Sequence, residues 1–199
     1  MNDLWLNMGG GLLLGYGLGS IPFGLLLTRL VGAGDIRTIG SGNIGATNVL
    51  RTGRKGIAAL TLLLDLLKGF FAVWLANRFL PGGEVLAAAG AFFGHLYPVW
   101  LKFKGGKGVA TFAGILFGLF WQGGVVYAVA WIGILLITRL SSLAGLVAAL
   151  CAPIAAAIFG YYELVAMLSA CTLIIFWKHR ENIERLIDGT EPRIGKNKS

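Results

Sequence analysis

The residues best suited to chemistry lie in a polar segment at positions 40–56, GSGNIGATNVLRTGRKG. Its glycines allow backbone N–H groups to converge, its Ser, Thr and Asn side chains donate hydrogen bonds, and its three cations neutralise negative charge. The segment contains no carboxylate. This composition suits a pocket for an oxyanion such as phosphate. A solvated loop whose cations only set membrane topology explains it equally well.

A second polar segment, residues 102–111, has two glycines flanked by Lys104 and Lys107 and leads directly into an apolar run. Free N–H groups at a helix N-terminus beside a lysine form a recognised anion site. The pattern G-x-x-x-x-G-K-[ST] of a P-loop is absent. A topology-setting loop with turn glycines is the alternative, but topology alone does not require two glycines between lysines. The pattern therefore favours phosphate binding.

The third polar segment, KHRENIERL at residues 178–186, follows the last apolar run. If it continues that helix, His179, Asn182 and Arg185 share one face and could point toward the other two segments. An ordinary amphipathic helix on lipid headgroups is the alternative. Taken alone, this segment slightly favours the alternative.

Three ionisable residues lie within apolar runs. Asp65 and Lys68 are three residues apart, so they can meet on one helix face, either for function or as a structural pair joining helices. His95 lies near the end of another run, where a satisfied interfacial histidine is favoured over direct catalysis. Cys151 and Cys171 are read as packing residues in apolar surroundings.

Several catalytic motifs are missing from the sequence. It has no H-E-x-x-H, C-x-x-C, acidic metal cluster or G-x-S-x-G elbow. We therefore expect neither a metal, nor a cofactor, nor a serine-hydrolase triad.

Composition places these residues in a membrane protein. Of the 199 residues, 56% are hydrophobic and 13% charged, and most of the chain divides into apolar stretches long enough to span a bilayer. We expect one all-α, polytopic membrane domain over residues 1–199. The net charge of +8 fits cations on one membrane face, near anionic headgroups and an anionic substrate, better than it fits nucleic-acid binding.

Seven transmembrane helices are expected. No cation precedes the first apolar run, so that run is read as a retained helix rather than a secretory signal. Residues 109–138 are predicted to form two short helices separated at Gln122-Gly123-Gly124. With that break, 15 of the 17 Lys and Arg residues share one side, leaving only Lys68 and Arg78 elsewhere. The N-terminus is then outside and the C-terminus cytoplasmic. The other expected helices cover residues 4–31, with a kink near Pro22, 57–79, 85–100, 143–159 and 164–177.

Taken together, the motifs resemble the bacterial acyl-phosphate:glycerol-3-phosphate acyltransferase (PlsY) family. The resemblance covers essentially the whole chain in order. It rests on residues 40–48 with Arg51, residues 65–69, residues 94–98 leading to 104–111, and residues 179–183 with Arg185 and Leu186.

The resemblance implies a multi-pass enzyme of the bacterial inner membrane whose active site faces the cytoplasm. It would transfer a fatty acyl group from acyl phosphate to the 1-hydroxyl of glycerol 3-phosphate, giving lysophosphatidic acid and phosphate. Its partners would be these two substrates and membrane lipid, with no nucleic acid and no cofactor. A soluble enzyme that makes acyl phosphate would be its metabolic neighbour.

The same resemblance assigns the site. Ser41, Arg51 and Lys107 are expected to hold phosphate, and His179 and Asn182 to position glycerol 3-phosphate. His179 is the plausible base, in competition with a substrate phosphate oxygen. The wider phosphate site comprises Ser41, Gly42, Asn43, Thr47, Asn48, Arg51, Lys104, Gly105, Gly106, Lys107 and Gly108, with Asp65, Lys68, His95 and Arg185 in support.

Two other classes of function use the same features. One is a carrier of a small anionic phosphorylated metabolite, which is weakened by the lack of an internal repeat. The other is a lipid-binding membrane protein, which has no use for the Ser-Gly-Asn and Gly-Gly-Lys arrangements.

Overall fold

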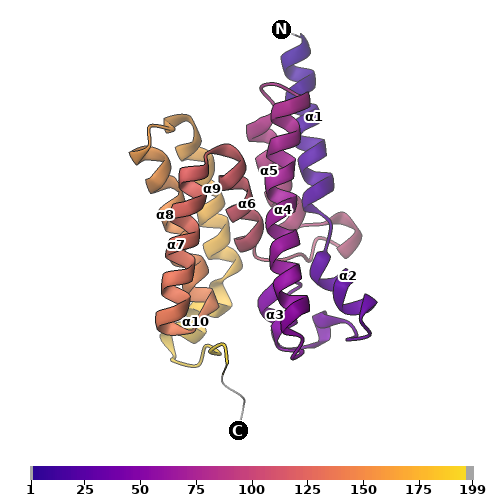
Figure 1. The fold of residues 1–199 in the computed structure, drawn as a ribbon, viewed down its shortest axis with the longest axis vertical. Helices are drawn as coiled ribbons and strands as arrows, with labels where there is room; N and C mark the ends of the chain where they lie inside the picture. Colours follow the sequence, from indigo (N-terminus) through magenta and orange to yellow (C-terminus); the bar gives the residue numbers. More distant parts are fainter. Residues whose placement is uncertain (1, 196–199) are drawn as a thin grey trace. The chain divides into compact units, whose positions relative to one another are not determined.

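The computed structural model describes residues 2–195, and all the regular secondary structure of these residues is helical (Figure 1). The helices are α1 (Asn2–Gly19), α2 (Phe23–Leu30), the 3-10 helix η1 (Ile36–Thr38), α3 (Ala46–Leu50), α4 (Lys55–Phe79), α5 (Glu84–Leu96), the 3-10 helix η2 (Val99–Leu101), α6 (Val109–Leu119), α7 (Trp121–Thr138), α8 (Ser141–Ile158), α9 (Tyr162–Lys178) and α10 (Arg180–Ile187). These residues form two compact units that meet in sequence at Leu119 and Phe120.

Four helical stretches of the described residues are long and apolar enough to cross a membrane: Asp3–Leu30, Lys55–Phe79, Trp121–Thr138 and Ser141–Ile158. Large apolar side chains on them are exposed, as Leu13, Leu136 and Ile137 illustrate at 75%, 76% and 81%. In water such surfaces would cause aggregation, whereas a bilayer solvates them. The expected number of seven spans stays a prediction, because α5, α6 and α9 are shorter than 18 residues.

The predicted break within residues 109–138 exists, but its position was wrong. The chain leaves the helix at Phe120, which is extended at φ −156° and ψ 114°, and α7 already includes Gln122, Gly123 and Gly124. The N–H groups of Gly123 and Gly124 donate to the Phe120 carbonyl. A Cβ on Gly123 would lie 2.1 Å from the Phe120 ring. Gly123 therefore makes room for that ring instead of ending a helix.

The first predicted helix is broken instead of kinked. α1 ends at Gly19, and Pro22 is the N-cap of α2. Proline lacks an N–H and disfavours helical geometry at the preceding residue, which explains the break. At the other end of the chain, His179 interrupts the predicted continuation of the last helix and becomes the N-cap of α10.

Glycines bring the helix backbones of the first unit into direct contact. A Cβ added to Gly15 of α1 would lie 2.0 Å from the Ala87 carbonyl oxygen of α5. Similarly, a Cβ on Gly114 of α6 would lie 1.8 Å from the Leu66 oxygen of α4. Such contacts are typical of membrane helices, where small residues allow close approach. They fix α5 against α1 and α6 against α4.

Replacing Gly15 by valine should therefore separate α1 from α5. We expect Gly15→Val to lower the free energy of unfolding by about 1–3 kcal/mol, the usual cost of overpacking. The measurement is the melting temperature of the purified protein in detergent. Gly17→Val is the matched control, because a Cβ on Gly17 meets no atom within 4 Å. Equal melting temperatures for the two variants would contradict this account of α1.

Candidate functional site

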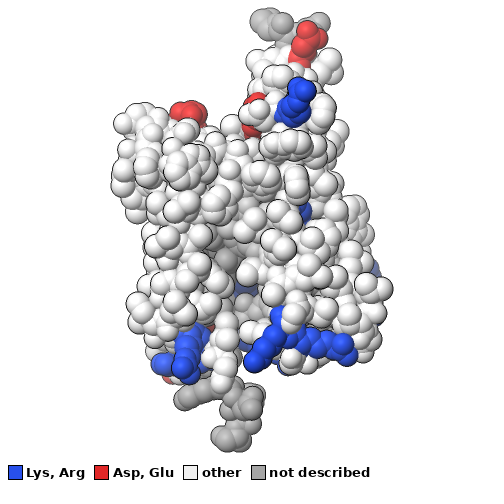
Figure 2. All heavy atoms as spheres, in the orientation of Figure 1, with Lys and Arg blue, Asp and Glu red and all other residues white. Residues whose placement is uncertain are grey.

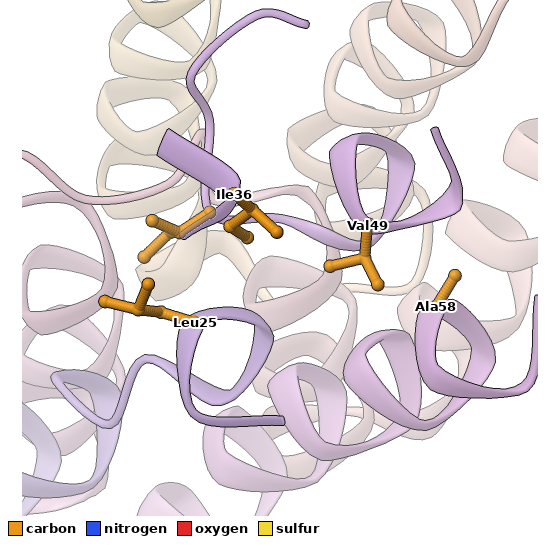
Figure 3. Close-up of a cluster of buried hydrophobic side chains, with 5 residues drawn as sticks. Leu25, Ile36, Val49 and Ala58 are labelled. Atoms are coloured by element: carbon orange, nitrogen blue, oxygen red, sulfur yellow. The ribbon is translucent and has the colours of Figure 1, made fainter. Parts of the chain in front are cut away.

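The polar segment before α4 is attached to the first unit through an apolar cluster beneath it. Leu25 of α2, Ile36 of η1, Val49 of α3 and Ala58 of α4 are buried together with Ile44, as Figure 3 shows. Each fully buried aliphatic side chain stabilises such a cluster by roughly 1.5–3 kcal/mol. The apolar residues of this loop thus anchor it to α2 and α4.

Asn48 organises the loop. Its amide Nδ2 donates to the carbonyls of Ile36, Ile39 and Asn43 at 2.8, 3.0 and 2.8 Å. Its Oδ1 accepts from the Ser41 N–H at 3.2 Å and from Arg51 Nη1 at 3.4 Å. Asn48 is only 2% exposed. These contacts favour a scaffolding role for Asn48 over the direct phosphate contact expected from the sequence.

Ser41 and Arg51, predicted to act together, do lie together. Both point at the Asn48 side-chain oxygen, and both are exposed. Gly40 and Gly42 flank Ser41 at φ +55° and +67°, in the left-handed region that favours glycine. A Cβ on Gly40 would lie 2.7 Å from both Arg51 and Asn48. The glycines therefore shape a tight turn that presents Ser41 beside Arg51.

Two further predicted phosphate ligands of this loop differ in their surroundings. The Asn43 side chain accepts the Gly45 N–H at 2.8 Å and so closes a local turn before α3. Thr47 is exposed on α3. Direct phosphate contact by Asn43, Thr47 or Gly42 stays a prediction.

Asp35 was not singled out from the sequence, although it neutralises two nearby cations. Its carboxylate accepts hydrogen bonds from Arg37 Nε at 2.9 Å and from Arg29 Nη2 at 3.2 Å. The hydrogen bonds from Arg37 hold the pKa of Asp35 well below its usual range. Arg29 and Arg37 are therefore paired cations, unlike Arg51.

The glycine turn at residues 104–108 is built differently from the expected anion cradle. The N–H of Gly105 donates to the Leu96 carbonyl at 3.1 Å, and the N–H of Gly106 donates to the His95 carbonyl at 3.0 Å. These two donors satisfy the C-terminal carbonyls of α5, which gives both glycines a structural role. Direct phosphate contact by Gly105 or Gly106 stays a prediction. Lys104 is exposed and Lys107 is half-buried.

Gly108 and its neighbours connect this turn to α6. Gly108 has φ +90°, and α6 begins at the next residue. Lys102 and Phe103, before the turn, also lie in the left-handed region at φ 52° and 61°. For residues other than glycine this conformation costs on the order of 1 kcal/mol each. The turn therefore needs the contacts with α5 to keep its shape.

The sequence prediction that Asp65 and Lys68 meet is confirmed. Lys68 Nζ lies 2.6 Å from Asp65 Oδ1, and both side chains are almost completely buried. His95 Nδ1 lies 3.8 Å from the same carboxylate oxygen. The three supporting residues predicted for the first unit thus form one buried cluster.

In the second unit, His179 lies at the junction of α9 and α10 and is 4% exposed. Its Nδ1 lies 2.8 Å from the Ile175 carbonyl oxygen. Because a carbonyl can only accept, Nδ1 carries the proton, and Nε2 is the basic nitrogen of the neutral ring. This tautomer is the one a general base acting through Nε2 requires.

Asn182 and Arg185 are joined by Glu191, a residue that the sequence analysis missed. Asn182 Nδ2 donates to Glu191 Oε1 at 2.6 Å, and Arg185 Nε donates to Oε2 at 2.7 Å. The sequence gives little signal for Glu191, which is one of four carboxylates in the basic tail at residues 178–199. Glu191 orients the Asn182 amide and neutralises Arg185.

The charge state of Glu191 follows from these contacts. Burial alone raises the pKa of Glu191, but hydrogen bonds from Ser142, Asn182 and Arg185 outweigh it, so the pKa lies below its ordinary value. The carboxylate is therefore ionised at neutral pH. Its stabilising contacts are lost only as the pH falls through that lowered value.

Positive charge is unevenly distributed within each unit. Figure 2 shows Lys and Arg side chains gathered at the end of the first unit where α2 and α3 lie, and at the end of the second unit where α10 lies. Among residues 2–195, no group of three or more His, Cys, Asp or Glu side chains is placed to hold a metal ion. Both cysteines are free thiols, with Cys171 buried.

Comparison with known proteins gives consistent matches. A family model described as glycerol-3-phosphate acyltransferase matches residues 10–189. A relative of that name from Rhodopseudomonas palustris (strain HaA2) is 59% identical over 189 residues, covering 94% of this chain and 95% of the relative. One from Brucella anthropi is 56% identical over 192 residues, with 96% of each chain covered.

The fold also matches a solved structure. The crystal structure of PlsY (YgiH), described as an integral membrane glycerol 3-phosphate acyltransferase in its glycerol 3-phosphate form, superposes with a TM-score of 0.88. That structure shares 37% sequence identity, and the match covers 98% of this chain and 96% of the other. These findings confirm the resemblance stated from the sequence motifs.

The central place of Asn48 leads to a testable expectation. Asn48→Ala removes the side-chain donor from three loop carbonyls, of which those of Ile36 and Ile39 keep the N–H groups of Ile39 and Gly42. The loss costs about 1–3 kcal/mol for a buried group left unsatisfied. The substitution also removes the acceptor that holds Ser41 beside Arg51. We expect a lower melting temperature and a smaller stabilisation by added inorganic phosphate. Asn77→Ala, at an exposed position of α4, is the control. An unchanged phosphate effect in Asn48→Ala would show that the loop is not the anion site.

Proposed function

Because this chain belongs to the glycerol-3-phosphate acyltransferase family, we propose that it transfers a fatty acyl group from acyl phosphate to the 1-hydroxyl of glycerol 3-phosphate. The products are 1-acylglycerol 3-phosphate (lysophosphatidic acid) and inorganic phosphate, the first acylation step of phospholipid synthesis. The observation that carries the proposal is the turn that holds Ser41 and Arg51 on the Asn48 oxygen, within a chain that matches the family over residues 10–189.

The choice of donor rests on charge and on chemistry. Acyl phosphate and glycerol 3-phosphate both carry phosphate, so a site for the pair needs several cations and hydrogen-bond donors without competing carboxylates. Ser41, Arg51 and Lys107 are the residues we assign to this task. Acyl phosphate is a mixed anhydride that is already activated. The reaction therefore needs no covalent acyl-enzyme, and the protein needs no nucleophile–base pair to form one.

The acyl group then passes directly from one substrate to the other, by addition to the carbonyl followed by elimination of phosphate. The 1-hydroxyl oxygen of glycerol 3-phosphate attacks the acyl carbonyl carbon, and the carbonyl oxygen becomes an oxyanion. Collapse of this intermediate re-forms the carbonyl and breaks the bond to the phosphate oxygen, which leaves with the electron pair. The protein supplies orientation and stabilisation of the developing charge, which are the two largest contributions available to such a step.

The hydroxyl proton has two possible acceptors. One is His179 Nε2, which the hydrogen bond from Nδ1 to the Ile175 carbonyl leaves as the basic nitrogen. The other is a phosphate oxygen of a substrate. We propose His179 as the base, with Asn182, oriented by Glu191, positioning glycerol 3-phosphate.

The chain is a multi-pass integral membrane protein, as its apolar helices and its solved structural relative indicate. We propose seven spans in the bacterial inner membrane, with the N-terminus outside and the reaction on the cytoplasmic side. Residues 1–199 would act as a single acyltransferase domain. The soluble enzyme that makes acyl phosphate would supply the donor. The alternative function, a carrier of a phosphorylated metabolite, is not proposed, because the family is one of acyltransferases.

The proposed reaction is tested with purified protein in detergent. Incubation with palmitoyl phosphate and glycerol 3-phosphate should give lysophosphatidic acid, whereas palmitoyl-CoA in place of the acyl phosphate should not. Lys107→Ala should lower kcat/KM by about 100-fold, as expected for removal of one charge-stabilising group. Product from acyl-CoA, or full activity of Lys107→Ala in a folded protein, would contradict the donor and the phosphate assignment respectively.

Steady-state kinetics distinguish a general-base role of His179 from a binding role. If His179 is the base, His179→Ala should lower kcat by about 100-fold or more, since general-base catalysis contributes 10²–10⁴-fold. The measurement is kcat and KM for glycerol 3-phosphate in the same preparation. Unchanged kcat with a raised KM would assign the proton to a substrate phosphate and leave His179 a binding role.

A further inference from the structure

The buried pair in α4 contacts two other parts of the first unit, the break between α1 and α2 and the end of α5. Lys68 Nζ lies 2.6 Å from Asp65 Oδ1 and also donates to the Ile21 carbonyl at 2.8 Å. Ile21 lies at the break between α1 and α2, where Pro22 interrupts the helical hydrogen bonds. Burying two charges in a membrane span is costly, and such residues are by default functional candidates.

The Asp65 oxygen that pairs with Lys68 also faces α5. His95, in the last turn of α5, places Nδ1 3.8 Å from Asp65 Oδ1 and is 4% exposed. That distance is too long for a hydrogen bond but within the range where the carboxylate's field orients an imidazole ring. The Asp65–Lys68 pair is therefore next to the His95 ring.

His95 in turn contacts the glycine turn on two sides. Its carbonyl accepts the Gly106 N–H at 3.0 Å. A Cβ on Gly106 would lie 2.0 Å from His95 Nε2, so the Gly106 backbone rests against the ring. Gly105 is equally close, since its Cβ would lie 2.1 Å from the His95 carbonyl oxygen. Lys107 is the next residue in the chain.

The same part of α4 also supports the far end of the turn. Gly69, one residue after Lys68, packs against the Thr111 carbonyl in the first turn of α6, where an added Cβ would lie only 2.3 Å from the oxygen. The turn is thus bounded by the end of α5 and the start of α6, both resting on α4 at residues 65–69. Lys102 and Phe103, strained at positive φ just before it, make such support necessary.

We propose that His95, backed by Asp65 and Lys68, is a positioning residue that holds Lys107 in place for the phosphate of a substrate. The inference rests on the proposed function, because it concerns the residue assigned there to phosphate. His95 makes no bond to substrate. It acts by fixing the backbone from which Lys107 extends, and Asp65 acts by fixing the His95 ring.

A double-mutant cycle tests this dependence. His95→Ala should lower kcat/KM for glycerol 3-phosphate by about 10-fold or more, and Lys107→Ala by about 100-fold. Because both changes act through one side chain, the combined variant should lie within about threefold of Lys107→Ala alone. Losses that multiply to about 1,000-fold would overturn the proposal. Lys107→Arg replaces Lys107→Ala in the cycle if the alanine variant is too slow to measure.

The controls separate positioning from general stability. Thr61→Val removes a buried hydroxyl of α4 that donates to the Ile57 carbonyl of its own helix, and it should leave kcat/KM unchanged. His95→Gln keeps a polar group toward Gly106 and should recover part of the activity. A His95→Ala protein with a wild-type kinetic constant and only a lowered melting temperature would reduce His95 to a structural residue.

The contribution of the ion pair needs its own variant, because removing one charge alone strands the other in the membrane. The double variant Asp65→Asn/Lys68→Met removes both charges at similar volume. We expect it to fold with a somewhat lower melting temperature, because the bond from Lys68 to the Ile21 carbonyl is lost, and to lose activity about as His95→Ala does. Full activity would overturn the role of the pair.

If the wild type makes no lysophosphatidic acid, the proposed function and this inference both fail. If the wild type is active and the cycle multiplies, only this inference fails.

Discussion

The close approach of helix backbones at glycine is the constraint on which the first unit depends. Between membrane helices, lipid is as apolar as a side chain, so association relies on van der Waals contact and on hydrogen bonds. Gly15 against Ala87 and Gly114 against Leu66 leave no room for a methyl group. These contacts fix α5 against α1 and α6 against α4, and with them the end of α5 and the start of α6 that bound the glycine turn. The glycine turn between them can therefore take only the path that these two ends allow.

Breaks between helices create the second requirement, which is to satisfy carbonyls that no longer have helical partners. The protein meets it with the residues that sequence patterns mark as functional. Lys68 bonds the Ile21 carbonyl, Gly105 the Leu96 carbonyl, and Asn48 three carbonyls of its loop. Some residues of these polar patterns thus have a structural role in the loops that carry the candidate site.

This division explains how much could be predicted from the sequence. The helix of residues 57–79, the meeting of Asp65 with Lys68 and the pairing of Ser41 with Arg51 follow from local periodicity and composition. The role of Gly105 and Gly106 could not be predicted, since it depends on where His95 lies in another helix. The break within residues 109–138 was predicted, but its position was not, because Gly123 and Gly124 pack against Phe120 instead of ending a helix. The part played by Glu191 was missed because Glu191 meets Asn182 and Arg185 only after the chain leaves α10.

The partners of the arginines distinguish Arg51, the cation we assign to phosphate, from three others. Asp35 neutralises Arg29 and Arg37, and Glu191 neutralises Arg185. Arg51 is held instead by the neutral amide oxygen of Asn48, and within residues 2–195 no carboxylate forms an ion pair with it. A neutral acceptor fixes the direction of a guanidinium without cancelling its field, whereas a carboxylate 3 Å away cancels most of it. An enzyme that must attract a phosphate and then release one needs an oriented but uncompensated cation. Arg51 meets that requirement, and the amide at position 48 is the reason.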